Sequence, residues 1–143
     1  MNRFENRTLD KGINAVIIKA NELLYPNSNM LRELIDKNDF KFKSGDGKDV
    51  VNKIVYCKAV APIFFYKPKN PFTRAMGYSD GKAIYLNSRK FKDFSFNDLV
   101  GLICHEYLHM VGFSHGNNYK TAEKCLYSVN YFVSESISQG KWI

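Results

Sequence analysis

All three histidines of the 143-residue chain lie in one short segment, HEYLHMVGFSH, at positions 105, 109 and 115. The segment belongs to a run of apolar residues at helical spacing that predicts a helix from near Phe96 to Gly112. Side chains four residues apart lie one turn above the other on one helix face, so His105 and His109 can reach one metal ion. Gly112 can adopt the left-handed conformation that ends helices, and the turn lets His115 approach as a third ligand. The pattern therefore requires a helix, a break and a returning chain around one metal.

Three neutral imidazoles leave the fourth tetrahedral position of a zinc ion open for water, as a catalytic zinc site requires and a structural site does not. The sequence thus predicts one Zn²⁺ per chain. Glu106 follows the first ligand and lies about 100° round the helix from it. Zinc lowers the pKa of a bound water towards about 7, so a carboxylate here can act as general base and then pass the proton to a leaving amine.

The segment resembles the extended zinc motif of the metzincin peptidases, H-E-x-x-H-x-x-G-x-x-H, and the resemblance covers about residues 77–116. It implies an α+β, zincin-like fold in which a small, twisted, mostly antiparallel sheet packs on an active-site helix. It also implies that His105, His109 and His115 bind zinc, that Glu106 is the catalytic base, and that the chain hydrolyses peptide bonds as an endopeptidase.

The same resemblance makes the segment Ala83 to Asn87 the sheet edge along which an extended peptide or protein substrate pairs. The substrate-binding residues expected from it are Ile84, Tyr85, Leu86 and Asn87. Some metzincins use a tyrosine to stabilise the oxyanion or to cap the zinc, and the candidates downstream of the motif are Tyr119, Tyr127 and Tyr131. An ordinary core or rim position is the alternative for each tyrosine.

Two features depart from the family pattern. Metzincins place a methionine in a turn beneath the zinc, yet no methionine follows Met110. The run Ser128 to Tyr131 is similar to that turn with Asn130 in place of methionine, whereas its helical periodicity predicts a helix. The family also commonly starts with a strand, whereas two helical patterns come first here.

Periodicity and turn residues predict the remaining elements. Amino-terminal helices are expected over Leu9 to Leu24 and Met30 to Ile35, followed by a polar loop over Lys43 to Asp49. Strands are expected over Val50 to Val60 and Ile63 to Tyr66, and a hairpin around Asp80-Gly81 is expected to join Ala75 to Tyr78 with Lys82 to Asn87. Ser95 is expected to cap the helix of the zinc motif, and a carboxy-terminal helical pattern covers Tyr119 to Val133.

The chain reads as a single domain over residues 1–143, because no linker-like tract or repeat interrupts it. Its first residues lack the apolar run of a secretory signal, and the longest apolar stretch, Val60 to Tyr66, is too short to span a bilayer. The three cysteines, at 57, 104 and 125, are an odd number and predict free, mostly buried thiols in a reducing compartment. We therefore expect a cytoplasmic or virion-associated protein without a membrane segment.

The formal charge of +7 is unevenly distributed. Residues 94–143 carry three lysines against four carboxylates, a charge of −1, so residues 1–93 carry +8. The lysines are scattered, which favours a solvated surface over a nucleic-acid site. The alternative function is a non-catalytic, zinc-stabilised binding or virion assembly protein that interacts through this basic amino-terminal lobe. Substrate identity, including protein against peptidoglycan, stays open on the sequence alone. So do endopeptidase against exopeptidase action and the oligomeric state.

Overall fold

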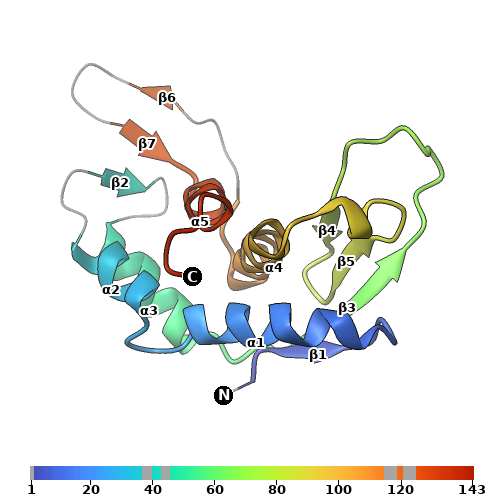
Figure 1. Ribbon diagram of the computed structural model, residues 1–143. Helices are drawn as coiled ribbons and strands as arrows, with labels where there is room; N and C mark the ends of the chain where they lie inside the picture. Colours follow the sequence, from blue (N-terminus) through green and yellow to red (C-terminus); the bar gives the residue numbers. More distant parts are fainter. Residues whose placement is uncertain (1, 37–39, 43–45, 115–118, 121–124) are drawn as a thin grey trace.

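Figure 1 shows the computed structural model, which describes residues 2–36, 40–42, 46–114, 119–120 and 125–143. The chain is an α+β protein. Its helices are η1 (Lys11–Ile13), α1 (Asn14–Leu23), α2 (Asn29–Asp36), α3 (Gly47–Tyr56), η2 (Phe91–Asp93), α4 (Phe96–Val111) and α5 (Val129–Ser138). Its strands are β1 (Phe4–Asn6), β2 (Phe40–Phe42), β3 (Ala61–Tyr66), β4 (Gly77–Ser79), β5 (Ile84–Asn87), β6 (Tyr119–Lys120) and β7 (Cys125–Tyr127).

The main sheet has four strands in the order β1-β3-β5-β4. The β1–β3 and β3–β5 pairs are parallel, and the β4–β5 pair alone is antiparallel. The prediction of a mostly antiparallel sheet is therefore wrong. Parallel neighbours need a long crossover, and the helices α1 to α3 supply one between β1 and β3. A second, three-stranded sheet has the order β2-β7-β6.

The antiparallel pair is the hairpin expected at Asp80-Gly81. The Asp80 carboxylate accepts the backbone N–H groups of Lys82 and Ala83, each at 2.9 Å, and these hydrogen bonds hold the pKa of Asp80 below its usual value. Gly81 has a φ of +84°, which an L side chain adopts at a cost. The hairpin prediction is confirmed, and in the structure β4 is the outer strand of the pair.

Two expected elements differ from the structure. Val50 to Val60 was expected to be a strand, but most of it belongs to α3, which starts with a capping box between Asp46 and Asp49. Tyr119 to Val133 was expected to be one helix, but α5 starts only at Val129, after the strands β6 and β7. The chain also begins with a strand, β1, which the helical patterns did not predict.

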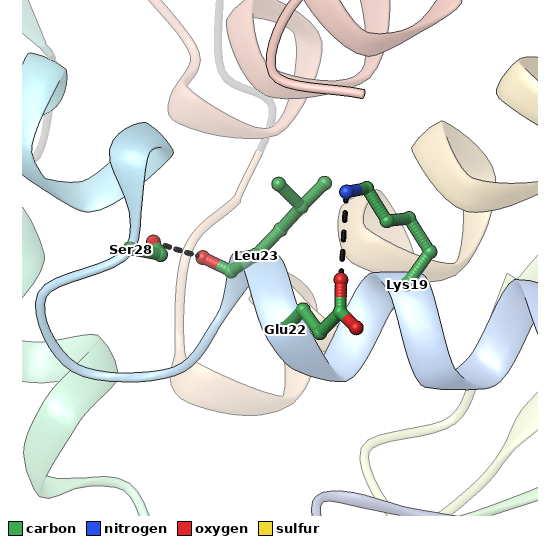
Figure 2. Close-up of polar contacts among 4 residues, drawn as sticks. All are labelled: Lys19, Glu22, Leu23 and Ser28. Carbon is green, nitrogen blue, oxygen red and sulfur yellow. Dashed lines mark hydrogen bonds and ion pairs between the residues drawn. The ribbon is translucent and has the colours of Figure 1, made fainter.

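The first two helices agree with the expected pattern, and Ser28 joins them. Its hydroxyl donates to the carbonyl of Leu23 at 2.5 Å (Figure 2). The same hydroxyl accepts the N–H of Leu31 at 3.1 Å. Lys19 and Glu22 form an ion pair of 3.4 Å on the exposed side of α1 (Figure 2). The turn after α1 thus fixes the direction of α2, while the apolar side of α1 enters the core.

Helix α4 runs through the middle of the molecule, between α5 and the main sheet (Figure 1). It starts at the Ser95 cap and ends at Gly112, whose φ is +118°, as expected. Tyr107 on α4 is fully buried. Its hydroxyl accepts from the Arg3 guanidinium at 2.8 Å and donates to the Ala59 carbonyl at 2.9 Å. Arg3 also donates to the Cys57 carbonyl at 2.9 Å, so β1 is tied to α4 through a buried cation.

The cysteines that the structure describes in full are free thiols, as expected. Cys104 is buried, and burial raises the pKa of its thiol to about 12, so it is inert at neutral pH. Cys57 is half-buried, and the side chain of Cys125 lies outside the described residues. Within the described parts of the chain, no helix has the length and apolar character needed to cross a membrane.

Candidate metal centre

The structure brings His105, Glu106 and His109 together on α4. One potential ligand atom from each residue lies within 4.8 Å of the others. The two histidines are one turn apart, and their ring centroids are 5.1 Å apart. Of the sequence-predicted metal site, these two imidazoles and the neighbouring carboxylate are therefore in place. His115 lies outside the described residues.

A hydrogen bond selects the tautomer of His109. Its Nδ1 lies 2.8 Å from the carbonyl oxygen of Phe113. A carbonyl can only accept, so Nδ1 carries the proton of the neutral ring and Nε2 presents a lone pair. Phe113 is buried directly after the helix-ending Gly112. The turn that ends α4 thus also orients a candidate ligand.

Helix α5 orients His105 in the same way. The Ser134 hydroxyl donates to the carbonyl of Tyr131 at 3.4 Å, so its oxygen is available to accept from Nδ1 of His105, 3.3 Å away. That arrangement again presents Nε2 as the lone-pair nitrogen. The Tyr131 ring also packs edge-on against the imidazole, with centroids 5.1 Å apart.

Asn130 supports the backbone beneath the same ligand. It is fully buried, and its Nδ2 donates to the His105 carbonyl at 3.1 Å while its Oδ1 accepts from the Ser128 hydroxyl at 3.3 Å. Ser128 precedes the first residue of α5, so the helical reading of this run is confirmed. A buried amide therefore lies under the site and holds the backbone of His105.

Glu106 lies in a poorly hydrated position. Its side chain is buried, with the residue only 6% exposed, and burial raises the pKa of its carboxyl to about 7. A carboxyl with this pKa exchanges its proton readily near neutral pH, because both of its protonation states are populated there. Strongly shifted groups beside a cavity mark candidate functional sites.

A cavity of about 580 Å³ opens beside His105 and Glu106. One side is formed by the chain that leads into β4, and the other sides are formed by α4 and α5. Its lining residues are Arg74, Ala75, Met76, Gly77, Asp98, Leu102, His105, Glu106, Tyr131, Ser134, Glu135 and Ser138. His105 and Glu106 thus face a space large enough for a substrate side chain.

The tyrosine candidates separate in the structure. Tyr131 lies beside His105 and lines the cavity, so its ring is in the right place to contact a substrate. Tyr119 and Tyr127 belong to β6 and β7, and their side chains lie outside the described residues.

The predicted substrate-binding segment is not a sheet edge. The strand β5, which contains Ile84, Tyr85, Leu86 and Asn87, is paired with β3 on one side and with β4 on the other. Ile84, Leu86 and Asn87 are buried, and Tyr85 stacks between Phe64 and Tyr78. Since a strand paired on both sides has no backbone groups left for another chain, the expectation that a substrate pairs along this segment is wrong.

Asn87 acts on the site indirectly. Its Nδ2 donates to the carbonyl of Ala75 and its backbone N–H donates to the carbonyl of Met76, both at 2.9 Å. These bonds hold the segment that lines one side of the cavity. Sequence reasoning missed this role and those of Asn130 and Ser134, although the spacing of Asn130 and Ser134 by one helical turn on an otherwise apolar helix face was a visible signal.

No protein-family model matches the chain, and no curated protein or solved structure is significantly similar to it.

Proposed function

We propose that the chain is a zinc-dependent peptidase that acts on internal peptide bonds. The observation that carries the proposal is the grouping of His105, His109 and the buried Glu106 on α4, beside a cavity that His105, Glu106 and the first residue of the edge strand β4 line. A structural metal site would have no use for an acid with a raised pKa or for an adjoining cavity.

The donor set fits zinc. Both imidazoles have Nδ1 engaged by an oxygen atom, so both present Nε2, and such supporting hydrogen bonds are typical of zinc-binding histidines. We propose His105, His109 and His115 as the ligands, the last from the sequence motif. When bound, the metal would supply a water of lowered pKa and would polarise the carbonyl that is attacked.

Glu106 performs the proton transfers in this proposal. Its carboxylate takes a proton from the attacking water and later donates it to the nitrogen of the leaving amine. Burial favours this exchange. A carboxyl pKa near 7 lies closer to the pKa values of the attacking water and the leaving amine than the pKa of an exposed carboxyl does. Tyr131 is the candidate to contact the developing oxyanion, since it lies beside His105.

Substrate backbone has a place to pair at β4. In the sheet that the structure describes, β4 is the last strand and is paired on one side only, with β5. It contacts α4 and begins at Gly77, which lines the cavity. An extended peptide added to this edge would run past Glu106, so β4 replaces β5 in the substrate-binding role. The packing of the sheet beside α4 is also consistent with a zincin-like fold, which we propose on the same basis.

The test combines metal content with hydrolysis. Elemental analysis should find one zinc per wild-type chain and a loss of zinc in His109→Ala. Cleavage of a quenched-peptide library should require zinc and should fall at least about 1000-fold in Glu106→Gln, because that variant keeps the side-chain shape and lacks the base. Glu22→Gln, with an exposed carboxylate on α1, is the matched control and should cleave like wild type.

Zinc that is retained without any cleavage would favour the alternative of a zinc-stabilised binding or assembly protein. Freshly purified protein without bound metal would contradict both functions.

A further inference from the structure

The cavity beside the candidate metal site extends along α4. Asp98, Leu102 and His105 all line it, and their spacing of four and three residues places them on one helix face. From His105 to Asp98 the helix axis advances by about 10 Å. The cavity therefore has a metal end, at His105 and Glu106, and a far end, at Asp98.

Helix α5 defines the same two ends. Tyr131 and Ser134 contact His105 at the metal end, while the Ser138 hydroxyl donates to the Asp98 carboxylate at the far end. Glu135, one turn before Ser138, also lines the cavity. The middle is apolar, with Leu102 on α4 and Met76 on the opposite side.

The charge of the cavity opposes the charge of the protein. Four carboxylate residues occur from position 94 onward in a chain of net charge +7, and three of them, Asp98, Glu106 and Glu135, line this cavity. Hydrogen bonds from Ser138 and Ser95 hold the pKa of Asp98 below its usual value, so it is ionised at neutral pH. Glu135 is exposed, and among the ion pairs of the described residues none involves it.

The far end offers mostly acceptors, because both carboxylates accept and the Ser138 hydroxyl already donates to Asp98. A ligand that fits must therefore bring hydrogen-bond donors and positive charge to this end, on an apolar stem that passes Leu102 and Met76. Lysine and arginine side chains have this build, and they extend about 6 to 7 Å beyond Cα. Together with the distance from a scissile carbonyl to the next Cα, this side-chain length is close to the rise of about 10 Å along α4 from His105 to Asp98.

From this we infer that the cavity is a side-chain subsite for a lysine or arginine next to the scissile bond. The inference rests on the proposed peptidase function and names its substrate class. Arg74 lines the cavity as well, from the segment that precedes β4. The positive charge of Arg74 repels a cationic substrate side chain, whereas the negative charge of Glu135 attracts it. Removing the charge of Arg74 should therefore strengthen the preference for lysine, and removing the charge of Glu135 should weaken it.

Cleavage of matched peptides by the zinc-loaded protein tests the subsite. Peptides of one sequence carry lysine, norleucine or glutamate at each position in turn, and mass spectrometry identifies the bond that is cut. At one position beside that bond we expect kcat/KM to be about 10-fold higher for lysine than for norleucine, which has the same stem without the charge. Glutamate should be the poorest residue there.

Variants then assign the selectivity to residues. Glu135→Gln should lower the lysine-to-norleucine ratio of kcat/KM about 3-fold, and Arg74→Gln should raise that ratio. Asp98→Asn should act like Glu135→Gln, but Asp98 also lies in the first turn of α4, so the exposed Glu135 gives the cleaner result. Glu22→Gln is the control for loss of a distant negative charge. Equal rates for lysine and norleucine at every position, or a ratio unmoved by Glu135→Gln, would overturn the subsite.

Binding separates this inference from the proposed function. Fluorescence anisotropy with zinc-loaded Glu106→Gln measures the affinity for the lysine and norleucine peptides without hydrolysis. If wild type cleaves nothing but the lysine peptide still binds more tightly in a Glu135-dependent way, the subsite stands and the peptidase function fails. Equal affinities for the two peptides would reject the subsite, whatever the outcome for cleavage.

Discussion

Replacing Asn130 by aspartate changes one buried nitrogen to oxygen beneath the candidate metal site. The amide Nδ2 that now donates to the His105 carbonyl at 3.1 Å becomes a carboxylate oxygen, which faces that carbonyl without a proton to share. The side chain keeps its size, and the Ser128 hydroxyl can still donate to the other oxygen. The effect of Asn130→Asp therefore reports on one hydrogen bond and on one buried charge.

Protonation sets an upper limit on the loss. A neutral aspartic acid can donate to the carbonyl and restore the contact, so the folded protein can always avoid a buried anion by binding a proton. Taking that proton up at pH 7 onto a group with an unfolded pKa of about 3.9 costs about 4 kcal/mol. The folded pKa of the new carboxyl is raised, so the stability is retained below pH 3.9 and is lost at about 1.4 kcal/mol per pH unit as the pH rises towards the folded pKa.

Urea unfolding of the chelator-treated protein at pH 5 and pH 7 measures this dependence. Relative to wild type, Asn130→Asp should lose about 2.5 kcal/mol more at pH 7 than at pH 5. Asn52→Asp, on the exposed side of α3, is the matched control and should change stability by less than about 0.5 kcal/mol at either pH. A loss that is the same at both pH values would refute the assignment of Nδ2 as a donor to the His105 carbonyl.

Three further changes test other parts of the site. In Gly112→Ala the added methyl group meets no atom within 4 Å, but alanine is forced to a φ of +118°. Urea unfolding should therefore show a loss of about 1 to 3 kcal/mol in unfolding free energy, and the zinc affinity should fall. Gly81→Ala, where φ is +84°, is the control and should leave zinc binding unchanged. In metal-free protein the pKa of Glu106 is raised from 4.5 to about 7, so the unfolding free energy of wild type should fall by at most about 3 kcal/mol as the pH rises from 4.5 to 7. Glu106→Gln should not show this fall, and parallel plots of unfolding free energy against pH for the two proteins would contradict the expectation. Tyr107→Phe removes the hydroxyl that accepts from Arg3 and donates to the Ala59 carbonyl, so it should lower the unfolding free energy by about 1 to 3 kcal/mol. An unchanged melting temperature would show that these two hydrogen bonds do not contribute to stability.

The sequence was informative where the signal is local. Ser95 and Gly112 mark the two ends of α4 because a hydroxyl cap and a left-handed glycine act within one turn of the helix. His105 and His109 lie close together on one face of α4 because four residues make about one helical turn. The Asp80-Gly81 turn is equally local, and it fixed the β4–β5 pairing in advance.

Errors arose where propensity and helix packing disagree. Val50, Val51 and Val55 are β-branched and predicted a strand, yet Val50, Val51 and Ile54 form the buried side of α3. The capping box of Asp46 and Asp49 satisfies the first backbone N–H groups of that helix. Tertiary burial of one helix face outweighed the weaker intrinsic preference of valine.

Strand order and inter-helix contacts were beyond reach for a different reason. Nothing in the composition of β5 reveals that β4 folds back outside it, so the edge was assigned to the wrong strand of a correctly predicted hairpin. Likewise, Asn130 and Ser134 reach His105 only because α5 docks on α4. Such contacts depend on how the elements pack, and one-dimensional periodicity does not contain that information.

The buried bond between Arg3 and Tyr107 has a consequence for the order of folding. It joins residues 104 positions apart, so it closes a loop that contains most of the chain, whereas Asn130 reaches His105 over 25 positions. Loop closure over long separations is slow and entropically costly. We therefore expect α4 and α5 to associate early and β1 to join late, so that during refolding the amides of α4 gain full protection from hydrogen exchange only in the last step.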